Sequence, residues 1–150
     1  MRILEGVADL AAAVGDHLGP SPWQEVGVDR IEAFADVTGD HQWIHVDHAR
    51  AAAGPFGSTI AHGYLTLSLI PSIVAELYRL HGIAMRVNYG LDRVRFPAPL
   101  PAGSRVRGEL DLLELTDTAR GPRLKTRVTI EAEAEAKPVC VAEILTLIVP

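Results

Sequence analysis

The stretch GYLTLSLIPSIVAELYRL, residues 63–80, is apolar on almost every face until Glu76 and Arg79. A helix that is hydrophobic all round is buried inside a protein. Pro71 predicts a kink or a displaced turn in it, because proline donates no backbone hydrogen bond. Residues 51–75 are uncharged, but glycines and prolines interrupt them, and the helical part is shorter than the roughly 20 residues of a membrane span. We therefore predict a long buried central helix and no membrane span.

Strand patterns follow this helix. Residues 123–136 alternate strictly, so that one face carries Leu124, Thr126, Val128, Ile130, Ala132, Ala134 and Ala136. Further strands are predicted at 84–90, 91–96, 104–117 and 139–149, with a register break near Asp111. Two helices precede the central one, at 5–17 and after a cap at Asp29. This order indicates a single α+β domain over residues 1–150, in which a mostly antiparallel sheet wraps the long helix, as in the hotdog fold.

The composition excludes several classes of protein. The net charge of −5 argues against a general nucleic-acid binder. The single cysteine, Cys140, cannot form an internal disulfide, and no zinc-binding Cys/His spacing occurs. Acidic residues interrupt the N-terminal segment, so we expect no signal peptide and a cytoplasmic protein.

The loop TGDHQWIH, residues 38–45, gathers an aspartate and two histidines in a short space. Gly39 sits where a helix commonly ends in a left-handed residue, which places Asp40 just past the helix end. Asp47 is expected to cap a further short helix through Ala53. The loop is therefore a candidate site between two helices.

Three blocks resemble the MaoC-like hotdog family: FADVTGDHQWIH at 34–45, AGPFGSTIAHGYLTLS at 53–68 and NYGLDRVRFPAPLPAG at 88–103. They occur in the family's order, and the resemblance covers roughly residues 25–149. Its best-known members are (R)-specific enoyl-CoA hydratases, which are 3-hydroxyacyl-thioester dehydratases in reverse; nodulation protein N relatives share the pattern. The resemblance implies reversible hydration of trans-2-enoyl thioesters of CoA or an acyl-carrier protein, without a metal or other cofactor.

The resemblance also assigns site residues. Asp40 and His45 match the catalytic aspartate and histidine, and Ser68 matches a helix serine that supports this pair in some members. Gly63 falls at the helix start, where a backbone N–H is expected to bind the thioester carbonyl. Gln42-Trp43 replaces the family's usual Asn-Pro, so the amide lies one methylene further out and the acyl site is expected to differ in shape.

The chemistry explains why such residues are needed. Hydration of an enoyl thioester requires a base for water, a proton for C2 and stabilisation of the enolate-like oxygen. An aspartate and a histidine separated by a short loop can hold one water, and positioned acid–base groups are typically worth ~10²–10⁴ in rate. The apolar neighbours Phe34 and Trp43 are expected to bury Asp40, and with Phe56 they would line the acyl groove or pack in the core.

Simpler interpretations exist for single residues. Thr38-Gly39-Asp40 alone indicates a helix stop and a polar turn, and His45 alone a structural histidine; the ordered blocks favour the catalytic interpretation. His62 is expected to cap or pack the helix start rather than take part in chemistry. Potential metal ligands also occur, but their spacing matches no ligand motif, so no metal site is predicted. These are Asp40, His41, His45, Asp47 and His48.

Other partners and functions stay open. Segment 86–107 is locally basic and could meet CoA phosphates or an acidic carrier protein, or form a solvated strand face or a dimer contact. Its arginines are Arg86, Arg93, Arg95, Arg105 and Arg107. An exposed strand edge predicts a homodimer. The alternative functions are a hotdog acyl-CoA thioesterase and a non-catalytic acyl-thioester-binding module.

Overall fold

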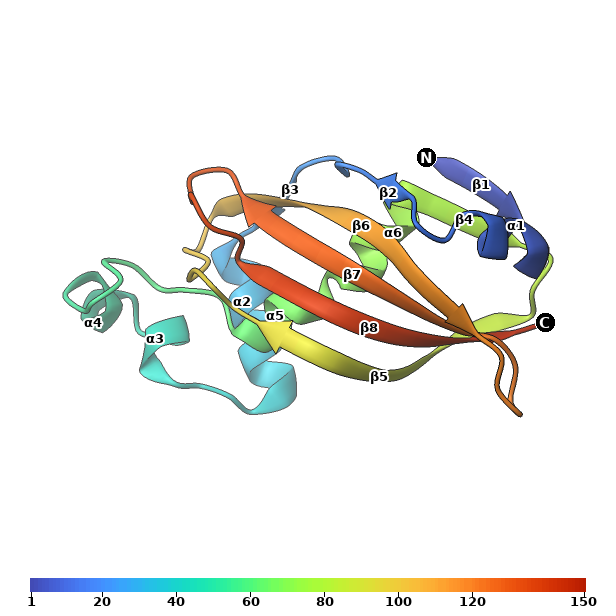
Figure 1. The fold of residues 1–150 in the computed structure, drawn as a ribbon. Helices are drawn as coiled ribbons and strands as arrows, with labels where there is room; N and C mark the ends of the chain where they lie inside the picture. The colour runs from blue at the N-terminus through green and yellow to red at the C-terminus, as the bar shows by residue number, and fades with distance from the viewer.

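The computed structural model describes residues 1–150 and shows a six-stranded sheet wrapped around a central helix (Figure 1). The strands are β1 (Arg2–Glu5), β2 (His17–Leu18), β3 (Gln24–Val26), β4 (Tyr78–His81), β5 (Met85–Arg95), β6 (Ser104–Thr116), β7 (Arg123–Ala132) and β8 (Cys140–Val149). The helices are α1 (Gly6–Ala12), α2 (Val28–Thr38), α3 (Trp43–Val46), α4 (His48–Ala52), α5 (Gly63–Ser68) and α6 (Ile70–Leu77). The predicted α+β hotdog fold is confirmed. None of these helices combines the length and apolarity needed to cross a membrane.

The large sheet is antiparallel, in the order β2-β6-β7-β8-β5, and β3 also pairs with β6. Alternation on β7 places five of the predicted side chains on the buried face: Leu124, Thr126, Val128, Ile130 and Ala132. The prediction that Ala134 and Ala136 continue this face is wrong. Strand β7 ends at Ala132, and both alanines are exposed in the turn before β8.

Strand β5 is continuous, whereas the sequence predicts two strands with a boundary after Gly90. Its pairing with β8 shifts register between Asn88 and Gly90 and again after Leu91. Such irregularities interrupt the alternation of side chains, which explains why the pattern indicates two strands. The break predicted near Asp111 of β6 is present, immediately after Leu112.

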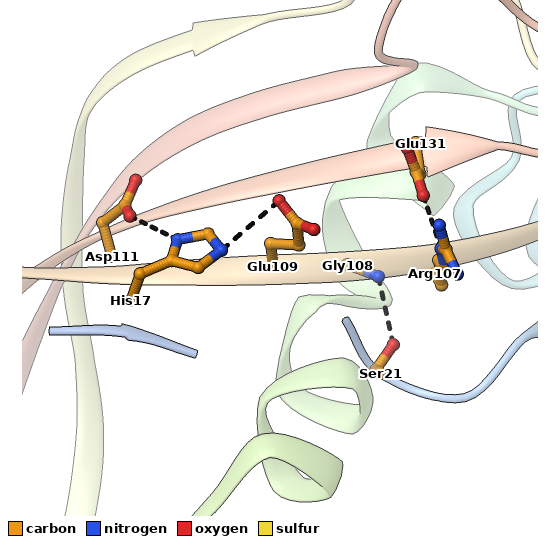
Figure 2. A network of polar contacts seen from close by, with 7 residues as sticks. All are labelled: His17, Ser21, Arg107, Gly108, Glu109, Asp111 and Glu131. Carbon is orange, nitrogen blue, oxygen red and sulfur yellow. Dashed lines mark hydrogen bonds and ion pairs between the residues drawn. The ribbon is translucent and has the colours of Figure 1, made fainter. Parts of the chain in front are cut away.

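Polar contacts fasten the N-terminal segment to β6, as Figure 2 shows. His17 lies between Asp111, whose Oδ1 is 2.7 Å from Nδ1, and Glu109, whose Oε2 is 3.5 Å from Nε2. The hydrogen bond to Asp111 is the main cause that raises the pKa of His17. The Gly108 N–H donates to the Ser21 hydroxyl at 3.0 Å. These contacts hold the segment before α2 against the sheet.

The central helix consists of α5 and α6, which meet at Leu69. Pro71 stands in the first turn of α6, where its missing N–H is tolerated, and this agrees with the displaced turn predicted from it. The helix ends at Leu77 rather than Leu80, because Tyr78–His81 is extended and pairs in parallel with β1. That pairing joins distant parts of the chain and has no local sequence signal.

The closest approach of the central helix to the sheet is at Gly108. A β-carbon at this position would lie 2.6 Å from Cγ2 of Ile73, which is fully buried on α6. The surrounding core includes Leu110, Val128 and Ile130. Because interiors are close-packed, only a residue without a side chain fits here unless Ile73 moves.

We expect Gly108→Ala to destabilise the fold by about 1–3 kcal/mol, because its methyl group would overpack the core against Ile73. Gly90→Ala is the matched control: it also lies on a strand, its φ is not positive, and no atom lies within 4 Å of an added β-carbon. Urea unfolding followed by circular dichroism measures both variants. Equal unfolding midpoints would contradict the close helix–sheet contact.

Candidate active site

Helix α2 positions Asp40. It ends at Gly39, whose φ of 78° is left-handed, as predicted. Oδ1 of Asp40 then accepts a hydrogen bond from the Gln42 N–H at 3.3 Å, which closes a local turn. Asp40 is exposed, so the expectation that its aromatic neighbours bury it is wrong. At the other end of α2 the cap predicted at Asp29 is also wrong, because Gly27 is the N-cap.

His45 lies on the short helix α3 and is buried. Its Nδ1 is 2.7 Å from the carbonyl oxygen of Ile60. A carbonyl only accepts hydrogen bonds, so Nδ1 carries the proton and Nε2 of the neutral ring is an acceptor. Burial is the main cause that lowers the pKa of His45, and neighbouring His62 also lowers it; the bond to Ile60 and the carboxylate of Asp40 oppose this. The result favours a neutral imidazole.

His62 joins the site, although the sequence assigns it only a capping or packing role. Its ring stacks on that of His45, with centroids 3.8 Å apart and 22° between the planes. Its Nε2 donates to the main-chain oxygen of Asp40 at 2.9 Å, while its buried Nδ1 has no partner. Polar atoms of Asp40, His45 and His62 lie within 4.8 Å of one another. The sequence feature that could have indicated a role for His62 in the site is its position as a titratable residue at the start of an uncharged helix.

Gly63 is the first residue of α5, directly after His62. The first N–H groups of a helix have no partner within it, and they point outward from its N-terminal end. A β-carbon on Gly63 would lie 3.0–3.2 Å from the ring of Phe96. The ring can therefore pack against the Gly63 backbone only because this residue has no side chain. The glycine thus sits beside the histidine pair with a free helical N–H.

Helices α3 and α4 form an extension beyond the sheet (Figure 1). Asp47 caps α4 as predicted, since its Oδ1 accepts from the Arg50 N–H at 3.0 Å. The ring of Trp43 packs under the Arg50 guanidinium, 4.2 Å away, and against Gly54. In the single chain Trp43 therefore stabilises the extension, and its neighbour Gln42 serves as the N-cap residue of α3.

Two of the metal ligands considered from the sequence, His41 and His48, are paired with other carboxylates. His41 is 2.8 Å from Asp36, and His48 is 3.2 Å from Glu32, so neither faces the loop carboxylate. Asp40, His45 and His62 are close enough to one another for a metal. The imidazole rings of His45 and His62 are stacked, however, so the nitrogen lone pairs of the two rings lie in nearly parallel planes. Tetrahedral zinc needs its ligand atoms to converge at about 2.0–2.1 Å from one point. The arrangement suits proton transfer better than metal binding.

The basic segment 86–107 is divided between two faces of the sheet. Arg105 forms an ion pair with Glu133, which follows β7, and Arg107 forms one with Glu131 of β7, as Figure 2 shows. These pairs lie on the outer face and neutralise both guanidinium groups. Arg86 is the only one of the five arginines on the inner face, opposite buried Ile148.

Two adjoining cavities lie between the central helix and the sheet. The wider, about 450 Å³, is lined by Tyr64, Leu67 and Ser68 of α5 together with β5. The narrower, about 270 Å³, lies further along α6. They share Ile70, Pro71, Asn88 and Ile144. Ser68 donates its hydroxyl hydrogen to the Leu65 carbonyl at 2.7 Å and makes no hydrogen bond to Asp40 or His45, so it faces the cavity rather than supporting the pair.

The chain is similar to several known proteins. Residues 9–135 match the model of the MaoC like domain. The chain is 53% identical over 144 residues to 3-hydroxyacyl-thioester dehydratase Z of Mycobacterium tuberculosis, covering 95% of each. It is 44% identical to nodulation protein N of Rhizobium leguminosarum bv. viciae, covering 95% of this chain and 90% of that one. An R-hydratase from Pseudomonas aeruginosa shares the fold with a TM-score of 0.72 at 27% identity, over 90% of this chain and 81% of that one. The chain therefore belongs to the MaoC-like dehydratase family.

Proposed function

We propose that the protein reversibly hydrates trans-2-enoyl thioesters to (R)-3-hydroxyacyl thioesters. One observation carries the proposal: polar atoms of Asp40, His45 and His62 lie within 4.8 Å of one another at the start of the buried helix. The 53% identity to a 3-hydroxyacyl-thioester dehydratase and the fold shared with an R-hydratase support this reaction. It needs no metal or other cofactor.

Asp40 and His45 are the residues we propose to hold the reacting water. The free acceptor of His45, Nε2, takes a proton from the water as its oxygen attacks C3, and Asp40 orients the water by accepting a hydrogen bond from its other hydrogen, which stays on the oxygen as the 3-hydroxyl. The C3–O bond forms while the electrons of the C2–C3 double bond move toward the thioester oxygen. The proton then passes from His45 to C2, so one whole water molecule is added. Dehydration runs through the same steps in reverse.

The backbone N–H of Gly63 is proposed to stabilise the negative charge that develops on the thioester oxygen. Its place at the start of α5 supports this role, because the helix dipole and a free N–H both favour negative charge. Donors of this kind are worth about 3–4 kcal/mol of transition-state stabilisation in other enzymes. Phe96 lies against the missing side chain and would exclude water from the carbonyl.

His62 is proposed as a positioning residue. Its Nε2–H bond to the Asp40 carbonyl ties the loop to the helix start, and its stacked ring fixes the plane of His45. Its Nδ1 is a buried acceptor without a partner, a feature that costs about 1–3 kcal/mol and calls for an explanation.

A homodimer is part of the proposal. Strand β5 is the edge of the sheet, its outer edge has no partner, and its apolar side chains are exposed. These side chains are Met85, Val87, Tyr89 and Leu91. An exposed apolar edge favours pairing with a second copy, and that copy would also cover the cavities beside β5.

The thiol of the substrate is proposed to be CoA or an acyl-carrier protein, and the location cytoplasmic. The single cysteine supports a reducing compartment: Cys140 is fully buried, and burial raises its pKa to about 11, so it stays a thiol.

Asp40→Asn and His45→Ala are each expected to lower kcat by ~10²–10⁴, because each removes a group that handles the water. Hydration of crotonyl-CoA followed at the enoyl absorbance, with chiral analysis of the product, measures this. His41→Ala is the matched control, since His41 lies in the same loop but pairs with exposed Asp36.

Full activity of the folded Asp40 variant would contradict the proposed mechanism. Loss of activity in EDTA would point to a metal at these residues. Release of free thiol without hydration would indicate the thioesterase alternative, and binding without turnover the non-catalytic module.

Below the pKa of His45 its ring is protonated and cannot accept the proton of water. Since burial lowers that pKa, kcat/KM is expected to fall with decreasing pH only below the ordinary range of histidine. His62→Phe keeps an aromatic ring against His45 but removes the electrostatic influence of the second imidazole, which lowers the pKa of His45, so the acidic limb should move to higher pH. The variant also frees the Asp40 loop, and kcat should drop by up to ~10². A pH profile and a kcat unchanged from those of the parent protein would exclude the positioning role.

A further inference from the structure

The inner face of the sheet carries a group of polar side chains beside α6, which we call the Arg86 pocket: Arg86, Asn88, Thr126 and Thr146. The register places them on one face, because Asn88 lies opposite Thr146 on β8, and Thr126 lies opposite inward-facing Ile144. They come from three neighbouring strands and line the narrower cavity of about 270 Å³. The face of a sheet that packs on a core is normally apolar, so this concentration needs an explanation.

The Arg86 pocket has no partner for its charge within the chain. The Arg86 guanidinium lies 5.6 Å from the centre of the Tyr78 ring and pairs with no carboxylate, and no acidic residue lines the cavity. Thr126 is only 5% exposed, yet its hydroxyl forms no hydrogen bond with another protein group. The outer-face Arg105 and Arg107, by contrast, are both paired with glutamates. The pocket therefore presents one free cation and several unused polar groups.

The Arg86 pocket continues the wider cavity along the central helix, and Asp40, His45 and His62 line neither cavity. Both cavities share Ile70 and Asn88, and the wider one starts beside Tyr64, one residue after Gly63. At a rise of 1.5 Å per residue, Ile70 lies roughly 10 Å along the helix from Gly63. Between these points the walls are mostly apolar, with Leu67 and Leu91 among them. An acyl chain that leaves the thioester would cross this apolar section and then reach the polar groups.

We propose that the Arg86 pocket binds a carboxylate at the far end of the acyl chain, so that the preferred substrates are enoyl thioesters with an acidic tail. This inference rests on the proposed hydratase function and adds the class of acyl group. Arginine matches the geometry of a carboxylate with two parallel hydrogen bonds. Arg86 is exposed in the single chain, and a methyl end would displace water from its guanidinium and from the Thr126 hydroxyl without replacing the hydrogen bonds, which disfavours an ordinary fatty acyl chain of the same length.

The test compares trans-2-decenoyl-CoA with trans-2-decenedioyl-CoA, two substrates of equal length that differ only in the end group. The parent protein is expected to show a kcat/KM about 10- to 100-fold higher for the dioic substrate. Arg86→Gln keeps the length of the side chain without its charge and is expected to bring this ratio close to one. Arg79→Gln is the matched control, because Arg79 is an exposed arginine of β4 outside both cavities.

Each outcome separates the two levels of the proposal. Hydration of any of the three substrates by the parent protein tests the reaction alone, and its absence with crotonyl-CoA and both ten-carbon substrates overturns both the proposed function and this inference. Hydration with a preference for the methyl-ended substrate, or an unchanged ratio in Arg86→Gln, overturns the inference and leaves the function standing. An equal loss for crotonyl-CoA and both ten-carbon substrates in Arg86→Gln would assign the arginine to the phosphates of CoA instead, and also overturns it.

Discussion

The fold depends on packing one face of the mostly apolar central helix against the sheet. Ile70, Ile73 and Leu77 of α6 are buried, and the sheet curves around them at a distance that Gly108 makes possible. The opposite face of the helix is exposed at Tyr64, Ser68, Ser72 and Glu76, whereas the buried polar groups of the site lie at the start of α5. That is where Asp40, His45 and His62 meet, so the packing of the core decides where chemistry can occur.

The burial of the helix start also favours the neutral form of His45. His45 and His62 each give one ring N–H to a main-chain carbonyl, and each therefore keeps its other nitrogen as an acceptor. Removal from water lowers the pKa of His45, while Asp40 stays in contact with solvent. A neutral base thus lies beside a carboxylate that solvent can reach. The neutral state of His45 and the exposure of Asp40 both follow from the position of α5 next to the loop of residues 38–45. Neither property requires an additional charged residue.

The two faces of the sheet use their polar residues differently. On the outer face Arg105, Arg107 and Arg127 are paired with glutamates of adjacent segments, and such exposed pairs contribute little to stability but remove free charge. On the inner face Arg86 has no such partner. The register irregularities of β5 change which side chains point inward along this edge strand. As a result, the edge combines an apolar exposed surface with a polar cavity.

The sequence by itself determined the features that depend on neighbouring residues. The central helix, the end of α2 at Gly39 and the Asp47 cap follow from local patterns, and the ordered blocks single out Asp40 and His45. The prediction that the central helix is buried on every face is wrong, however, since Ser68, Ser72 and Glu76 are exposed. Only the tertiary structure added His62 to the pair, exposed Asp40, joined β1 to β4 and left Arg86 unpaired. The physical reason is that periodicity, helix ends and caps are set within a few residues. Contacts between distant segments depend on how those segments pack, which no local pattern encodes.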